Sequence, residues 1–134
     1  MIKTYRGSCH CGRVRFEADI DLGAGTARCN CTFCTKTRWW GTTIKPEAFR
    51  LLEGEKHLSE YRWNTGQARQ LFCSNCGVRS FGRGDIPEIG GAYVSINVAA
   101  LDNVTPQELA ALPVRHLNGR ADDWMHEPAV SSYL

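Results

Sequence analysis

The chain has 134 residues, of which 43% are hydrophobic and 22% charged, a composition that excludes a disordered protein and allows one domain with a buried core. Its 16 basic and 14 acidic residues give a formal charge of +2, so we expect no nucleic-acid partner. No apolar run approaches the ~20 residues of a membrane span, and the N-terminal MIKTYRGSCHCG lacks the apolar core of a signal peptide. We therefore expect a reducing cytoplasmic location and no membrane partner.

Alternating hydrophobicity predicts a mainly β fold of short antiparallel strands. In residues 14–20 (VRFEADI) apolar side chains alternate with charged ones, and residues 92–98 (AYVSINV) repeat this pattern. Gly, Asn and Pro separate most of the expected strands, as in the NTG turn at 64–66. Further short strands are predicted at residues 42–44, 49–52, 58–63 and 68–72.

One short helix is predicted after Thr105, which is a typical N-cap residue. Pro106 then occupies the first helical position, and Glu108 completes a capping box before an apolar run. Residues 45–49 (KPEAF) suit one further helical turn, and the final SSYL segment is either frayed or docked. No repeat or linker interrupts the sequence, so we expect one zinc-binding domain over residues 1–134.

The seven cysteines form three clusters with the spacing of metal ligands. An odd number cannot pair completely as disulfides, and a reducing compartment favours metal binding over disulfides. The Cys-x-x-Cys-Gly pattern at residues 73–77 is typical of a zinc knuckle, since the glycine permits a tight turn behind the sulfur. A redox motif would need a βαβ context, and an iron–sulfur cluster would need a different spacing. The clusters are Cys9 and Cys11; Cys29, Cys31 and Cys34; Cys73 and Cys76.

Seven ligands divide most simply into four and three, with one zinc ion for each set. The two pairs that precede a glycine would form a closed structural site, which leaves Cys29, Cys31 and Cys34 as a set of three. Three protein ligands and an open position are the pattern of a catalytic zinc. In a rival grouping, Cys29 and Cys31 join Cys73 and Cys76, and this alternative stays open.

A zinc ion held by three thiolates predicts thiol chemistry. The site would carry a net charge of about −1, so it should activate water less well than a site of three histidines. A soft thiolate suits the fourth position, and a thiol bound there loses its proton near neutral pH while it stays nucleophilic. The predicted reaction is attack by an activated thiol on an electrophile such as a carbonyl carbon.

Three segments carry a resemblance to a known family: GSCHCGRVRFEA, CNCTFCTKT and LFCSNCGVRSFGRG. In order and spacing they resemble the glutathione-dependent formaldehyde-activating enzymes, also called the centromere-protein-V-like family, over residues 3–125. The resemblance implies a fold of the β-tent type and a carbon–sulfur lyase that combines glutathione with formaldehyde into S-hydroxymethylglutathione. Another small aldehyde is an alternative substrate. It also implies a structural zinc on Cys9, Cys11, Cys73 and Cys76 and a catalytic zinc on Cys29, Cys31 and Cys34.

Other residues are candidates for substrate contacts. Arg38 and Arg69 suit the carboxylates of glutathione, and Trp39 suits an aromatic wall, with surface or core positions as the alternative for each. His116 and His126 are candidate acid or base groups or solvent-exposed side chains. The family resemblance extends to residues 116–124 (HLNGRADDW), whose role the sequence does not indicate.

The rival function is a non-enzymatic zinc module that binds a protein or another macromolecule through its tryptophan-bearing surface. It predicts a second zinc closed by a further protein ligand, or no second zinc. The enzyme hypothesis instead predicts a small thiol and an aldehyde as partners. Both leave the assembly state open, including a homodimer.

Overall fold

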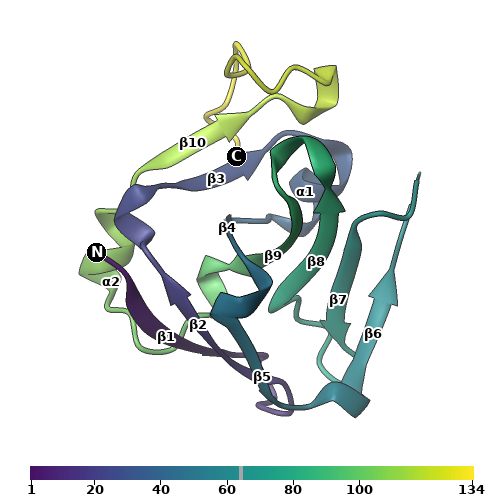
Figure 1. Ribbon diagram of the computed structural model, residues 1–134. Coiled ribbons are helices and arrows are strands. Elements are labelled where there is room, and N and C mark those ends of the chain that lie inside the picture. The colour runs from purple at the N-terminus through teal and green to yellow at the C-terminus, as the bar shows by residue number, and fades with distance from the viewer. Residues whose placement is uncertain (64) are drawn as a thin grey trace.

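The computed structural model describes residues 1–63 and 65–134, which form two β-sheets that share one core (Figure 1). The smaller sheet has the order β1-β2-β5, from β1 (Lys3–Ser8), β2 (Arg15–Ile20) and β5 (Phe49–Glu53). The larger sheet has the order β10-β3-β4-β9-β8-β7-β6. Its strands are β3 (Thr26–Cys29), β4 (Gly41–Ile44), β6 (Leu58–Tyr61), β7 (Arg69–Cys73), β8 (Phe81–Ile86), β9 (Gly91–Asn97) and β10 (Val114–Leu117).

The mainly β prediction is confirmed, and the alternating segments are half-buried strands. Phe16, Ala18 and Ile20 of β2 all point into the core. Strand β9 buries Val94 and Ile96, whereas Ala92 at its start is exposed. The predicted NTG turn includes Asn64, which lies outside the described residues.

Two α-helices and one parallel strand pair go beyond the predicted antiparallel sheet with a single helix. Helix α2 (Pro106–Ala110) begins as expected, because Thr105 Oγ1 accepts the Glu108 N–H at 3.1 Å. Helix α1 (Thr32–Thr37) was not expected, and β10 pairs in parallel with β3. In the described part of the chain, no helix is long and apolar enough to cross a bilayer. Short 3₁₀ turns cover Leu22–Ala24, Pro46–Ala48, Glu55–His57, Pro87–Ile89, Val98–Ala100 and Gly119–Ala121.

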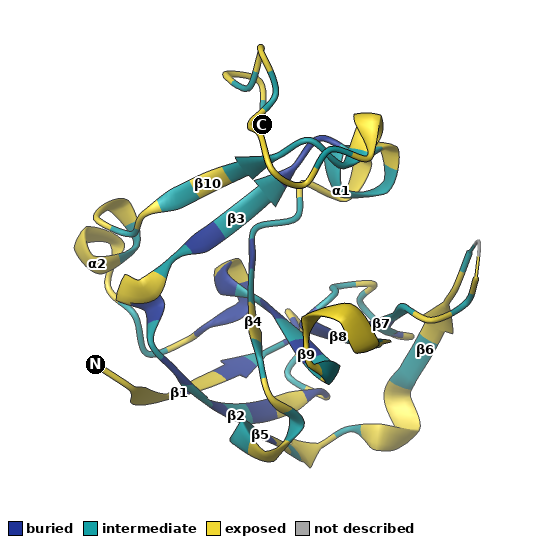
Figure 2. Ribbon diagram, turned by 45° about the horizontal axis from the view of Figure 1, so that its top comes forward, coloured by how far each residue is buried: buried dark blue, intermediate teal, exposed yellow. Residues whose placement is uncertain are grey.

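An aromatic cluster fills the space between the two sheets. Phe16 of β2 lies 5.6 Å from Phe49 and 6.1 Å from Phe81, measured between ring centroids. The buried residues of β2, β8 and β9 surround this cluster (Figure 2). Burying each such side chain contributes about 1.5–3 kcal/mol, so the cluster is a main source of the fold's stability. Gly7 is required beside it, because any Cβ there would overlap the Phe16 ring.

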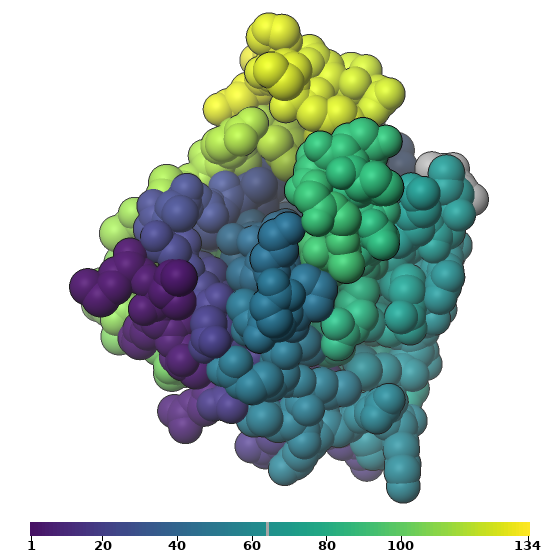
Figure 3. Space-filling view, in the orientation of Figure 1, coloured from purple at the N-terminus to yellow at the C-terminus, as the bar shows by residue number. Residues whose placement is uncertain are grey.

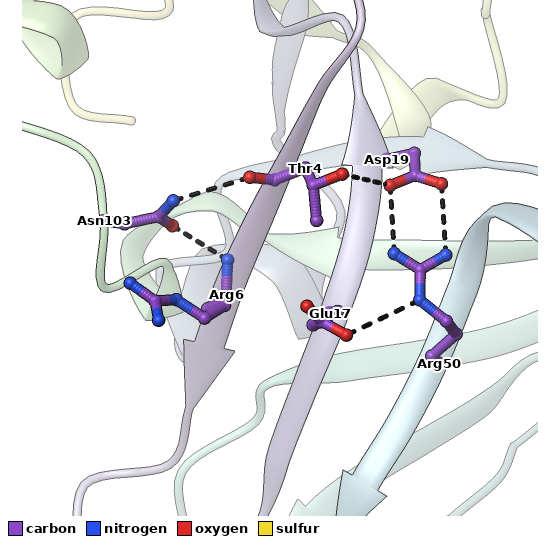
Figure 4. Close-up of polar contacts among 6 residues, drawn as sticks. All are labelled: Thr4, Arg6, Glu17, Asp19, Arg50 and Asn103. Atoms are coloured by element: carbon purple, nitrogen blue, oxygen red, sulfur yellow. Dashed lines mark hydrogen bonds and ion pairs between the residues drawn. The ribbon is translucent and has the colours of Figure 1, made fainter.

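Polar contacts join the exposed face of the smaller sheet (Figure 4). Arg50 donates two hydrogen bonds to Asp19 at 3.0 and 3.1 Å, and the Thr4 hydroxyl donates a third at 2.7 Å. These donors lower the pKa of Asp19 to about 2. Asn103 Oδ1 accepts the Arg6 N–H at 2.8 Å, so the loop before α2 is attached to β1.

Candidate metal centres

Four cysteines from two distant segments meet in one cluster, the four-cysteine cluster of Cys9, Cys11, Cys73 and Cys76. Their sulfur atoms all lie within 4.8 Å of one another. The Cys11 sulfur is 3.6 Å from those of both Cys9 and Cys73. Ligands of one tetrahedral zinc ion with Zn–S bonds of ~2.3 Å would be about 3.8 Å apart, so these residues fit zinc.

Two tight turns give the four-cysteine cluster its shape. Gly12 follows Cys11 with a φ of 81°, and its N–H bonds to the Cys9 carbonyl at 3.1 Å. Gly77 follows Cys76 with a φ of 79°, and its N–H bonds to the Cys73 carbonyl at 2.8 Å. Glycine adopts this left-handed conformation without the steric cost that a Cβ adds, which is the reason for the Cys-Gly pairs.

The remaining three cysteines form a second cluster, the trio of Cys29, Cys31 and Cys34. Cys29 ends β3, Cys31 is the N-cap of α1 and Cys34 lies within that helix. Their sulfur atoms also lie within 4.8 Å of one another, and no fourth Cys, His, Asp or Glu joins them among the described residues. The structure thus groups the cysteines four and three and does not bring together the rival set. None of the seven forms a disulfide.

Backbone N–H groups and neighbouring thiols polarise the trio. The Cys31 N–H donates to the Cys29 sulfur at 3.4 Å, and the Cys34 N–H donates to the Cys31 sulfur at 3.3 Å. Hydrogen bonds from the other two thiols lower the pKa of Cys31, and the same contacts raise the pKa of Cys34. One sulfur therefore carries negative charge readily in a group of three soft donors, which is a donor set that suits a soft cation.

Arg79 connects the loop that follows the four-cysteine cluster, between β7 and β8, to the helix of the trio. Its guanidinium lies 4.0 Å from the centroid of the Trp39 ring and 4.6 Å from that of Phe33. It also donates hydrogen bonds to the Thr37 hydroxyl, at 3.3 Å, and to Gln70 Oε1. Both Phe33 and Thr37 belong to α1, so this side chain fixes the helix from one side.

Arg79 carries a positive charge near the sulfur atoms of the trio. Burial of its guanidinium lowers the pKa of Arg79 to about 10, whereas negative charge on Cys34 and Cys31 acts to raise it. The Nε atom is buried and has no hydrogen-bond partner among the described residues. Nothing local to position 79 in the sequence marks this arginine as buried.

The segment at residues 117–120 supports the loop between Cys29 and Cys31. Asn30 in that loop is buried, donates to Asn118 Oδ1 at 2.9 Å and accepts the Arg120 N–H at 3.0 Å. A Cβ on Gly119 would lie 2.7 Å from the Cys29 sulfur, so only glycine fits against it. These contacts indicate a structural role for the segment at 116–124, a role that the sequence did not indicate.

A cavity of about 10 Å³ lies beside the trio, with room for roughly one water molecule. Its lining brings together two cysteines, two arginines, a threonine, a tryptophan and an apolar side chain. The lining residues are Arg28, Cys29, Cys34, Thr35, Arg38, Trp39 and Leu134.

A family model described as glutathione-dependent formaldehyde-activating enzyme matches residues 4–117. The chain belongs to this family. The match contains both cysteine clusters and every strand from β2 to β10.

Two relatives of this glutathione-dependent formaldehyde-activating family member extend the comparison. A protein of Halomonas elongata, named after the same family, is 35% identical over 78 residues, which are 52% of this chain and 50% of that protein. The chain thus matches about half the length of this curated relative. A crystal structure of a Rhodobacter sphaeroides protein has a TM-score of 0.69 at 29% identity, and the match covers 81% of this chain and 98% of that one.

The residues predicted to contact glutathione in this family member occupy two different places. Arg38 and Trp39 line the cavity beside the trio, whereas Trp40 packs against the core, so the adjacent tryptophans face opposite sides. Arg69 lines a separate groove and pairs with Glu60. Its role in glutathione binding stays a prediction and has less geometric support than that of Arg38.

The two histidine candidates have carboxylate neighbours outside the cavity. His116 Nδ1 lies 3.5 Å from Glu127, and His126 Nδ1 lies 3.2 Å from Asp123. Sequence reasoning also missed Arg28, which adjoins Cys29 in the sequence and lines the cavity with it. Its position next to the first cysteine of the trio is the signal that would have found it.

Proposed function

We propose that this protein is a carbon–sulfur lyase that combines glutathione with formaldehyde, or another small aldehyde, at the trio of Cys29, Cys31 and Cys34. The observation that carries the proposal is the trio itself: three converging sulfur atoms beside a cavity, with no fourth protein ligand among the described residues. A closed structural site would use four ligands, whereas three ligands leave a position for a substrate. Membership of the family supports the same reaction.

In this proposal each cysteine cluster holds one zinc ion. Cys9, Cys11, Cys73 and Cys76 would hold a structural ion, and the trio would hold the catalytic one. When bound at the trio, zinc supplies the positive charge that lowers the pKa of an incoming thiol toward neutral pH. Location in the cytoplasm stays a prediction.

The residues around the cavity would bind and orient the two reactants. Arg38 would hold a carboxylate of glutathione, and Trp39 would form an apolar wall that excludes water next to the reacting atoms. The glutathione sulfur then forms a bond with the aldehyde carbon, and the π electron pair of the carbonyl moves to its oxygen. That oxygen takes up one proton, which solvent supplies, since the residues that line the cavity include no His, Asp or Glu side chain.

Exchange NMR on zinc-loaded protein tests this function directly. The wild type should accelerate the exchange of ¹³C-formaldehyde with its glutathione adduct, and Cys34→Ala should return the rate to that of the spontaneous reaction. Metal analysis should show one zinc ion fewer per chain in Cys34→Ala, with an unchanged circular dichroism spectrum. Wild-type protein with both sites loaded and no acceleration would instead favour the non-enzymatic zinc module.

A further inference from the structure

Two arginines approach the cavity beside the trio from different elements. Arg28 lies in β3 directly before Cys29, and Arg38 follows the last residue of α1. Both line the cavity together with Cys29 and Cys34. A ligand in this place would therefore meet two guanidinium groups as well as sulfur atoms.

Neighbouring contacts hold both arginines in position. The Arg28 guanidinium lies 4.9 Å from the centroid of the Trp40 ring, and the Trp40 Nε1–H donates to Thr26 Oγ1 at 2.8 Å. Arg38 is the C-cap of α1 with a φ of 54°, and its N–H bonds to the Thr35 carbonyl at 3.4 Å. Both side chains therefore extend from anchored backbone, and the Arg28 guanidinium is also held against the Trp40 ring, whereas Arg38 is exposed.

The pair lacks the acidic partner that Arg15, Arg50, Arg62 and Arg69 have. Arg50 pairs with Asp19 and Arg69 pairs with Glu60, but in the described part of the chain no carboxylate lies within 4.0 Å of Arg28 or Arg38. An anion between the two guanidinium groups would pair with both, and arginine forms its strongest hydrogen bonds with carboxylates.

The end of the chain now occupies this position. The Arg38 Nη1–H donates to the Tyr133 carbonyl at 2.7 Å, and Leu134 lines the cavity. The Leu134 N–H bonds to the Ser131 carbonyl at 3.0 Å, which folds the segment at 131–134 into a turn. In both ribbon views the C-terminus lies near α1 and the ends of β3 and β10, and the part of the chain after β10, in yellow, forms the top of the space-filling view (Figures 1, 2 and 3).

A cavity of about 10 Å³ admits little more than one water molecule, so a thiol substrate needs more space than the segment at 131–134 leaves. A carboxylate accepts hydrogen bonds as the Tyr133 carbonyl does, but it carries a full charge and so binds arginine more strongly. The buried Thr35 hydroxyl, which lines the same cavity and has no partner in the described part of the chain, is a further group for a ligand.

We propose that Arg28 and Arg38 form a carboxylate subsite for the thiol substrate, and that residues 131–134 cover this subsite until a carboxylate displaces them. The proposal rests on the proposed function for the identity of the thiol, and it restricts the substrate class to small thiols that carry a carboxylate. Neutral thiols of the same reactivity are poor substrates.

Binding of S-methylglutathione, measured by isothermal titration calorimetry, tests the subsite without any catalysis. This thioether keeps both carboxylates of glutathione but has no thiol to react. Its diethyl ester should bind the wild type at least about tenfold more weakly, since each lost bond between a charged pair costs about this factor. Arg28→Gln and Arg38→Gln should bind the acid and the ester equally.

Arg6→Gln is the matched control, because Arg6 is an exposed arginine of β1 outside this cavity. It should keep the full preference for the acid. No binding of S-methylglutathione, or equal binding of acid and ester by the wild type, would overturn the subsite. If the wild type prefers the acid to the ester but does not accelerate formaldehyde exchange, the proposed function is overturned and the subsite stays in place.

Hydrogen exchange followed by mass spectrometry on the full chain tests the displacement of residues 131–134. S-methylglutathione should accelerate amide exchange in this segment, because the Leu134 N–H loses its bond to Ser131 when the turn is displaced. The diethyl ester at the same concentration should leave exchange unchanged. Unchanged exchange at saturating S-methylglutathione would show that the segment stays in place and is no cover.

Discussion

At the scale of single residues, Arg79 shows how a charge is kept beside the trio. Its guanidinium is sandwiched between Trp39 and Phe33, and the residue lies only three positions after Cys76 of the four-cysteine cluster. A cation–π contact contributes about 0.5–2 kcal/mol, so two of them offset part of the cost of burial. We therefore regard Arg79 as a positioning residue that holds α1 and balances the negative charge of the trio.

Replacing Arg79 with methionine should weaken zinc binding at the trio by about 10- to 100-fold, the range for loss of a residue that orients metal ligands. Arg79→Lys keeps the charge and should recover most of this loss. In a competition assay with a chelator, zinc should be released in two steps. Only the weaker step, which we assign to the trio, should change.

Arg83→Met is the control for Arg79→Met. Arg83 also lies over two aromatic rings, at 5.1 Å from Phe49 and 5.6 Å from Phe81, but these rings belong to the core. If both methionine variants change zinc release equally, the effect is one of general stability and Arg79 has no specific role at the trio.

The sequence indicated the ligand residues but not the side chains that surround them. The cysteines are recognisable because each cluster has a local spacing that a metal requires. Arg79 is not, because its burial depends on a segment far away in the chain, where it contacts Thr37. The closing of the cavity beside Arg28 by Leu134 is equally non-local. Such contacts carry no periodicity that a single sequence reveals.

At the scale of secondary structure, α1 is an element that tertiary contacts create. A helix of six residues with three threonines is too short to be stable alone. It forms here because the Cys31 sulfur accepts the Cys34 N–H at its start and Arg38 adopts the left-handed conformation at its end. By contrast, strands with clear alternation, such as β2, and the capped helix α2 were predictable locally. The short strands predicted at 42–44, 49–52, 58–63 and 68–72 also fall on β4, β5, β6 and β7.

Gly119→Ala should disturb the trio while the sheets stay folded. The added Cβ would lie 2.7 Å from both the Cys29 sulfur and the Trp124 ring, so the segment at 117–120 must move away from the loop that it supports. Zinc content should fall at the trio, with a loss of unfolding free energy of about 1–3 kcal/mol from overpacking.

Gly23→Ala provides the matched change at a place with space. There the nearest atom to a new Cβ is Asp21 Oδ1, at 3.5 Å, an ordinary contact distance. Metal content and melting temperature should stay at the wild-type values in this variant. Retention of full zinc by Gly119→Ala would mean that the segment can shift without moving Cys29.

At the scale of the whole molecule, the four-cysteine cluster joins the two sheets. Cys9 and Cys11 lie in the connection from β1 to β2 of the smaller sheet, whereas Cys73 ends β7 of the larger sheet and Cys76 lies in the turn that follows it. The sequence predicted strands and this link, but not the division into two sheets or the parallel pairing of β10 with β3, because pairing depends on long-range contacts. The aromatic cluster around Phe16 is the second connection between the sheets.

Cys76→Ala should therefore unfold the domain, whereas Cys34→Ala should not. A structural zinc site contributes about 10–16 kcal/mol of binding free energy in peptides, which is comparable to the ~5–15 kcal/mol total stability of a small domain. The aromatic core alone would have to hold the two sheets together once the four-cysteine cluster lost a ligand. Thermal unfolding followed by near-UV circular dichroism in excess zinc should show a cooperative transition for Cys34→Ala and none for Cys76→Ala. A Cys76→Ala variant that melts within a few degrees of the wild type would show that the core suffices and that this cluster is not structural.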